Sequence, residues 1–172
     1  GWKNLKAVTV TGSKTVSVHD KEKTTEWCKK WFAYLQGHPL TGNQLPKVGT
    51  AGLVSSMQMR GLLSTKNYSA GQFEHFEDVS GERLAEEFNI TNKGCLTCPI
   101  RCARTVMVQG KAVKGPEPET LGLLGGNICN NDLQKILDWN YELDELGMDT
   151  ISTANTIAWA MEANEKGLWD NG

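Results

Sequence analysis

The sequence lacks the features of several common protein classes. No apolar run approaches the length of a membrane-spanning helix and no signal peptide is visible, so we expect no membrane partner. No basic block is longer than a pair and the net charge is only -2, so we do not expect nucleic acid as a partner. The three histidines stand alone, without metal-ligand spacing, and neither an internal repeat nor a dinucleotide-binding glycine pattern occurs.

What remains is the composition of an ordinary globular protein. The 172 residues suffice for one domain with its own core, and 39% of them are hydrophobic, which is a normal share. The chain opens on Gly-Trp-Lys rather than on Met, and we therefore expect a piece of a larger protein. Its five cysteines, an odd and clustered set, favour a reducing compartment, and we expect the cytoplasm.

The first segment and the rest of the chain differ in pattern. Residues 5–18 alternate with β-branched side chains around Gly12, which predicts two short strands and a turn. We interpret residues 1–19 as the end of a preceding β-containing domain. From Asp20 to about Gln36 the pattern is helical, with Trp27, Trp31 and Leu35 on one apolar face. Cys28, beside Trp27, is expected to be a small core residue.

The remaining elements are mostly helical. Further helices are predicted over residues 50–62, 80–88, 132–146 and 150–166, with a short one after residue 115 and a hairpin over 105–113. Thr50 is predicted to cap its helix, which would turn Leu53, Met57 and Leu62 inward. Gly167 is the predicted stop of the last helix. The helix over 132–146 carries broad apolar faces of Leu133, Ile136, Leu137, Trp139 and Leu143. The sequence thus predicts a mainly α protein: a helical domain over 20–172 with a small β-hairpin, preceded by the β-strand end of another domain.

Three cysteines within eight residues are the most informative feature. Cys95, Cys98 and Cys102 form a C-x2-C-x3-C pattern, and Pro99 bends the chain between the last two. Three thiols fit a disulfide poorly because one is left over, whereas they suit a soft metal or an iron–sulfur cluster. Two metal sites stay open from spacing alone: a [4Fe-4S] cluster with a fourth ligand elsewhere, or zinc completed by Cys28, Cys129 or a histidine. Coincidence is the third interpretation.

Two acidic motifs follow the cysteines. Asp144-Glu-Leu-Gly-Met-Asp149 places a D-x-x-G-x-D pattern between two helices. Gly147 and Asp149 there suit a helix C-cap and N-cap, and the two carboxylates also suit a ligand rich in N–H donors, such as a pterin. Gly115-Pro-Glu-Pro-Glu-Thr120 sets Glu117 and Glu119 at a helix start, as dipole partners or as a general base near a cofactor.

Taken together and in this order, these motifs resemble the tungsten-dependent aldehyde:ferredoxin oxidoreductases. The resemblance rests on three runs, Gly94-Cys-Leu-Thr-Cys-Pro-Ile-Arg-Cys102, Gly115-Pro-Glu-Pro-Glu-Thr120 and Asp144-Glu-Leu-Gly-Met-Asp-Thr-Ile-Ser-Thr153. It spans nearly the whole chain, and Lys3-Asn-Leu-Lys-Ala7 looks like that family's junction between its first two domains.

The resemblance implies an enzyme that oxidises aldehydes to carboxylic acids, with ferredoxin as electron acceptor and two metal cofactors. It implies a tungsten or molybdenum atom held by two pyranopterins, a [4Fe-4S] cluster on Cys95, Cys98 and Cys102, and ferredoxin or another electron-transfer protein as partner. Asp144, Gly147 and Asp149 would bind one pterin, and the catalytic carboxylate would be Glu119, with Glu117 as the fallback. The resemblance also leaves room for a magnesium ion and a homodimer, with a small aldehyde or thioester as substrate.

Parts of the family pattern lie outside this sequence. The fourth cluster cysteine, the second pterin motif and the substrate-lining last domain are missing, so we expect the chain alone to hold no complete cofactor and to be inactive. The E-x-x-H iron pair of some members is replaced here by Asp138-Trp-Asn-Tyr141. Three other functions stay open: a related complex that reduces benzoyl-coenzyme A, a zinc-stabilised interaction module, and an electron-transfer piece that keeps the cluster but has lost catalysis.

Overall fold

The computed structural model describes residues 3–88 and 90–169; residues 1–2 of the predicted N-terminal segment and 170–172 of the predicted helical domain lie outside this description. The α-helices are α1 (Lys21–Gly37), α2 (Leu45–Val48), α3 (Leu53–Met59), α4 (Gly81–Glu87), α5 (Pro118–Leu124), α6 (Leu133–Leu146) and α7 (Thr150–Glu165). The strands are β1 (Thr91–Lys93), β2 (Ala103–Val108) and β3 (Lys111–Lys114). The prediction of a mainly α fold with a small hairpin is confirmed.

Helix α5 lies at the centre of the core. Six of its seven residues are buried, including Leu121 and Leu124. It packs against α3, α6 and α7, so one short apolar helix is shared by several neighbours. Burying a leucine side chain stabilises a fold by about 1.5–3 kcal/mol, which makes this helix a main source of stability. Val106 and Val108 of β2 and Ile136 and Leu137 of α6 belong to the same cluster.

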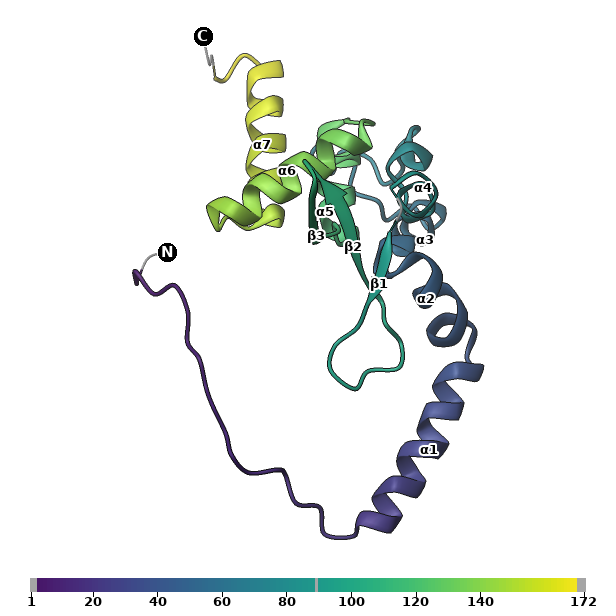
Figure 1. Cartoon of the computed structure of the whole chain (residues 1–172). Coiled ribbons are helices and arrows are strands. Elements are labelled where there is room, and N and C mark those ends of the chain that lie inside the picture. Colours follow the sequence, from purple (N-terminus) through teal and green to yellow (C-terminus); the bar gives the residue numbers. More distant parts are fainter. Residues whose placement is uncertain (1–2, 89, 170–172) are drawn as a thin grey trace.

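The sheet has one strand more than the predicted hairpin. Its order is β1-β2-β3, all antiparallel, and β1 pairs with β2 from Thr91↔Thr105 to Lys93↔Ala103. The turn between β2 and β3 is Gln109-Gly110, where both residues have positive φ, as expected for a tight hairpin. The pairing of β1 with β2 closes the segment 94–102 into a loop that extends from the sheet, away from the helices α4 to α7 (Figure 1).

Helices α6 and α7 follow the prediction closely. Asp132 caps α6 by accepting from the Lys135 N–H, and Leu133, Ile136, Leu137 and Leu143 are buried as expected. Gly167 has a φ of +65° just after α7, in agreement with its predicted role as the stop. None of the helices in residues 3–88 and 90–169 is long and apolar enough to cross a membrane.

The N-terminal segment departs from the prediction. Residues 3–18 are exposed and carry no strand, because β-structure needs a hydrogen-bonded neighbour and no other described segment pairs with them. Figure 1 shows this segment as an extended trace leading into α1, which runs out from the body of the molecule. Helix α1 forms as predicted but buries no residue, and Trp27 and Trp31 are each 61% exposed. The expectation of a buried Cys28 is therefore wrong, since its thiol is exposed.

The predicted helix over 50–62 is shorter and differently placed. Residues Thr50–Gly52 form a 3₁₀ turn, and α3 ends at Met59. Thr50 caps neither helix, because its hydroxyl is bonded to Glu117 instead. The apolar face is also shifted: Leu53 and Leu62 are exposed, and Val54 is the fully buried residue. Met57 packs partly against the core, as expected.

Candidate functional site

The three clustered cysteines share the loop between β1 and β2. Cys95 is exposed, Cys98 and Cys102 are half-buried, and all three thiols are free. The Cys98 N–H donates to the Cys95 carbonyl over 3.0 Å, which turns the chain back on itself between the first two cysteines. Thr97 and Arg101 have φ values of 64° and 53°, so the loop bends sharply again before Cys102.

The sulfur atoms do not meet at one point in this structure. Among residues 3–88 and 90–169, no group of three or more His, Cys, Asp or Glu side chains is placed to hold a metal ion. The two further cysteines lie on other elements: Cys28 on α1 and Cys129 just after the turn at 126–128. The donor set nevertheless fits a soft metal or an iron–sulfur cluster, because three free thiols occupy a single exposed loop.

A buried arginine at the foot of the loop adds to this fit. Arg104 is only 5% exposed, and its guanidinium donates to the carbonyls of Arg101, Ala103 and Leu45 over 3.0, 2.9 and 2.6 Å. Its Nε is buried without a partner. An orphaned donor and a fixed positive charge beside Cys102 suit a site that holds an anionic group.

Gly49 allows this foot to pack closely. Its φ and ψ are 67° and -165°, a region that only glycine occupies readily. A Cβ at Gly49 would lie 2.6 Å from the Cys102 carbonyl oxygen and 3.3 Å from Cζ of Arg104. The backbone of residue 49 therefore lies directly against Cys102 and Arg104.

The two acidic motifs meet in a second place. A cavity of about 220 Å³ is lined from the β3–α5 connection, from α6 and from the α6–α7 corner. Glu117, Asp144 and Asp149 all line it, with Lys114, Thr120 and Thr150 between them. This volume lies below the roughly 300–1,000 Å³ of a typical ligand pocket, so the cavity suits one edge of a ring system rather than a whole large cofactor.

The D-x-x-G-x-D motif is a helix–turn–helix corner. Gly147 has φ 68° and ψ 32° and ends α6 as a left-handed C-cap, while Asp149 caps α7 by accepting from the Ser152 N–H over 2.7 Å. This hydrogen bond from the Ser152 backbone, reinforced by the Ser152 side chain, lowers the pKa of Asp149 below its usual value. Asp144 is exposed, and its carboxylate has no partner in the described part of the chain. One acid is thus committed to capping, and the other is free to accept from a ligand.

The two glutamates of the Pro-Glu-Pro-Glu run have different surroundings. Glu117 accepts from the Thr50 hydroxyl over 2.5 Å and pairs with Lys114 over 3.0 Å. Burial raises the pKa of Glu117, but these two partners together outweigh it, and the pKa lies below its usual value. Glu119 lies in the first turn of α5, exposed and without a partner among residues 3–88 and 90–169, and it does not line the cavity.

Several contacts connect the cysteine loop, the cavity and the starts of α5 and α7 into one framework, and none of these contacts was predicted from the sequence. The Thr120 and Thr150 hydroxyls lie 2.9 Å apart and join the starts of α5 and α7. The Gly115 N–H donates to the Arg104 carbonyl over 2.9 Å. Gly49 touches the foot of the cysteine loop while its neighbour Thr50 holds Glu117, so two adjacent residues connect both places. No spacing rule points to a single threonine or glycine.

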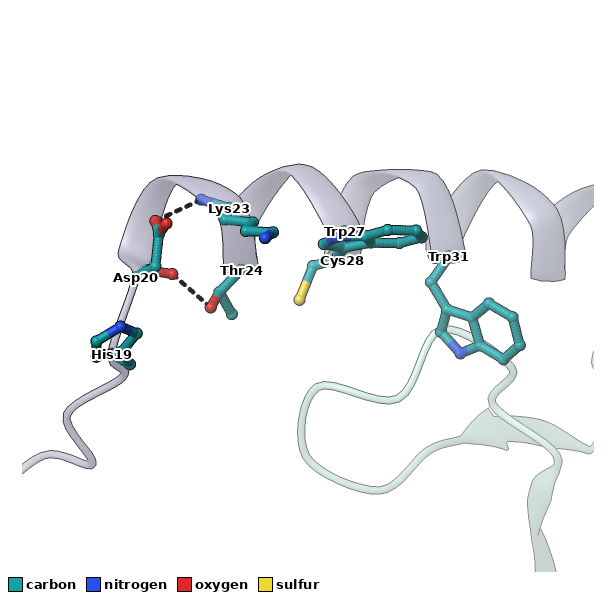
Figure 2. A pocket seen from close by; sticks show the side chains of 7 residues that line it. All are labelled: His19, Asp20, Lys23, Thr24, Trp27, Cys28 and Trp31. Carbon is teal, nitrogen blue, oxygen red and sulfur yellow. Dashed lines mark hydrogen bonds between the residues drawn. The ribbon is translucent and has the colours of Figure 1, made fainter.

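Two of the other hollows lie apart from the cysteine loop and the acidic cavity. A hollow of about 540 Å³ is formed only by α1 and the two residues before it, as Figure 2 shows for His19, Asp20, Lys23, Thr24, Trp27, Cys28 and Trp31. A second, of about 580 Å³, lies between the turn at 66–69, the turn at 127–129 and α7. Its polar side chains bond to one another, with Asn67 donating to Glu162 and Lys66 paired with Glu165.

Comparison with known proteins identifies the family. Residues 26–172 match the family model described as aldehyde ferredoxin oxidoreductase, domains 2 and 3. The tungsten-containing aldehyde ferredoxin oxidoreductase of Pyrococcus abyssi is 44% identical over 169 residues, and that of Thermococcus kodakarensis 43% over 168. These alignments cover 98% and 97% of this chain but 28% of each relative.

A more distant relative carries a different name. The aliphatic sulfonate oxidoreductase, WOR-like subunit, of Pyrococcus furiosus is 27% identical over 176 residues, covering 98% of this chain and 27% of that protein. The chain thus spans little more than a quarter of the length of these relatives. The family-model match and the 43–44% identities agree with the motif order, and the chain belongs to the aldehyde ferredoxin oxidoreductase family.

Proposed function

We propose that the protein containing this chain is a tungsten or molybdenum bis-pyranopterin enzyme that oxidises aldehydes to carboxylic acids and passes the electrons to ferredoxin. The observation that carries the proposal is that two adjacent residues connect the cysteine loop to the acidic cavity. Gly49 lies against Cys102 and Arg104 at one end of the loop. Its neighbour Thr50 bonds to Glu117, which lines the cavity together with Asp144 and Asp149. Short links between a cluster site and a cofactor pocket are what electron transfer between them requires.

The three thiols would hold a [4Fe-4S] cluster. Cys95, Cys98 and Cys102 supply three of its four ligands, and the fourth comes from outside this chain. Cys95 is exposed and its neighbour Leu96 is 93% exposed, so the tip of the loop is open to a ferredoxin or another electron-transfer protein.

The acidic corner would hold one pterin. Asp144 offers a carboxylate that no other described side chain occupies, and Asp149 keeps its capping bond while facing the same cavity. Both acids accept hydrogen bonds, as the N–H groups of a pterin require. Gly147 provides the left-handed turn that brings the two together. A magnesium ion and a homodimer remain parts of the proposal that rest on the resemblance alone.

Glu119 would act as the general base. Aldehyde oxidation consumes one water and releases two electrons and two protons, and the bound tungsten or molybdenum supplies the acceptor for the electron pair. A base must be free to reach the attacking oxygen, and Glu119 has no partner in the described chain, whereas Thr50 and Lys114 hold Glu117. We therefore assign proton transfer to Glu119 and positioning of the loop to Glu117.

The matched glutamate variants test this assignment. In the complete protein, purified without oxygen, Glu119→Gln should lower aldehyde turnover by about 10²–10⁴-fold with unchanged tungsten and iron content. Glu86→Gln, an exposed glutamate in α4, is the control and should behave as wild type. Normal turnover in Glu119→Gln, together with loss in Glu117→Gln, would move the role to Glu117.

The substrate class is the element of this proposal for which specific alternatives exist. The distant relative is named for aliphatic sulfonates. The resemblance described from the sequence also leaves a benzoyl-coenzyme A-reducing complex as an alternative. Assays with small aldehydes, an alkyl sulfonate and an aromatic coenzyme A thioester separate these alternatives. We propose aldehydes, on the 43–44% identity to relatives of that name, and a cytoplasmic location, on the clustered free cysteines.

A further inference from the structure

Arg104 carries a positive charge where a charge is costly. Its side chain is 5% exposed, and its Nε has neither a protein partner nor contact with solvent. Its other donors meet three backbone carbonyls, and no carboxylate in the described chain pairs with it. A buried cation without an anion is strongly disfavoured, so this position calls for a negative partner.

Arg104 lies against the foot of the cysteine loop. It follows Cys102 by two residues, and its guanidinium donates to the Arg101 carbonyl, on the other side of that cysteine, over 3.0 Å. Gly49 contacts both Cys102 and Arg104, since a Cβ there would approach the Cys102 carbonyl oxygen at 2.6 Å and the Arg104 Cζ at 3.3 Å. The guanidinium and the third cysteine therefore share one small space at the foot of the loop.

The same arginine also holds the cysteine loop against α2 through hydrogen bonds. Its fork joins the carbonyl of Arg101, inside the loop, to that of Leu45 in α2. Across the strand pair, Asn92 lies opposite Arg104 and donates to the Pro46 carbonyl over 2.7 Å. A neutral donor is enough to hold the strand pair against α2, since the amide of Asn92 does so. Holding the loop therefore does not explain why residue 104 carries a positive charge.

We propose that Arg104 is a positioning residue whose buried positive charge balances the negative charge of the iron–sulfur cluster on Cys102 and raises its reduction potential. This inference rests on the cluster in the proposed function. Each one-electron reduction adds a negative charge to the cluster, and a fixed cation beside one ligand favours the reduced form. An arginine performs both tasks, because its remaining donors still hold the loop against α2.

Three variants separate charge from hydrogen bonding. Arg104→Lys keeps the charge and loses the fork, and Arg104→Gln keeps a neutral donor and loses the charge. Arg101→Gln removes the same charge from an exposed side chain of the same loop. The complete protein is purified without oxygen, iron is measured, and the cluster is titrated with dithionite while its paramagnetic signal is followed.

The expected order of midpoint potentials is specific. Arg104→Gln should shift to a clearly more negative potential than wild type, while Arg104→Lys and Arg101→Gln stay near the wild-type value. An unshifted Arg104→Gln, or an equal shift in Arg104→Lys, would overturn the proposal while the proposed function stands. If Arg104→Gln retains too little iron to titrate, iron kept by Arg104→Lys supports the charge role, and iron lost from both overturns it. Wild-type protein without iron would refute both proposals.

Discussion

Replacing Gly49 by alanine should disturb the cysteine loop from a distance in sequence of more than forty residues. The backbone angles of Gly49, φ 67° and ψ -165°, cost an alanine about 1–3 kcal/mol. The new Cβ would also lie 2.6 Å from the Cys102 carbonyl oxygen, and relieving such an overlap costs about 1–3 kcal/mol more. We expect a local destabilisation of about 3–5 kcal/mol at the foot of the loop.

Amide hydrogen exchange can locate this loss of local stability in the Gly49→Ala variant. A change of about 1.4 kcal/mol alters an opening equilibrium tenfold, so amides of β1 and β2 should exchange at least about a hundredfold faster in Gly49→Ala of the complete protein. Gly147→Ala is the matched control, because Gly147 has a φ of +68° with nothing within 4 Å of an added Cβ. Its smaller effect, about 1–2 kcal/mol, should stay at the α6–α7 corner. Unchanged exchange in β1 and β2, or the same change in both variants, would refute the close-packing argument.

Two further predictions concern the cysteines and the acidic corner. Cys98→Ser should lose most of its iron because a hydroxyl is a poor ligand for a soft metal, whereas Cys28→Ser on α1 should keep it; equal iron contents would refute the ligand assignment. The pKa of Asp149 is lower in the folded protein than its usual value of 3.8. Its stabilisation of α7 should therefore be fully present above pH 3.8 and should disappear as the pH falls through the lower pKa of the folded state. Hydrogen exchange of α7 between pH 5 and 2 should show this loss in wild type and not in Asp149→Asn, and a parallel loss in both would count against it.

The sequence predicted the elements whose signals are local. Asp149 caps a helix, Gly147 and Gly167 end helices, and the Gln109-Gly110 turn forms its hairpin, because each depends on a few neighbouring residues. The core face of α6 was readable for the same reason, since helical periodicity of Ile136 and Leu137 selects one side. Two of these residues, Gly147 and Asp149, form the α6–α7 corner of the candidate site.

What the sequence could not provide depends on contacts between distant segments. Thr50 looked like a cap but bonds to Glu117, 67 residues away, and that pairing exists only once α3 and α5 are packed. The alternation in residues 5–18 indicated strands, yet a strand requires a neighbour that the described chain does not supply. The role of Arg104 was invisible because its carbonyl partners come from three different positions.

Elemental analysis of the complete protein, purified without oxygen, separates the tungsten or molybdenum oxidoreductase from a zinc-binding module. We expect about four iron atoms per chain together with tungsten or molybdenum, as a [4Fe-4S] cluster and a bis-pyranopterin centre require. Stoichiometric zinc with neither iron nor tungsten nor molybdenum would contradict it. The three cysteines would then belong to a zinc-stabilised interaction module, on a scaffold that shares the family's fold without its chemistry.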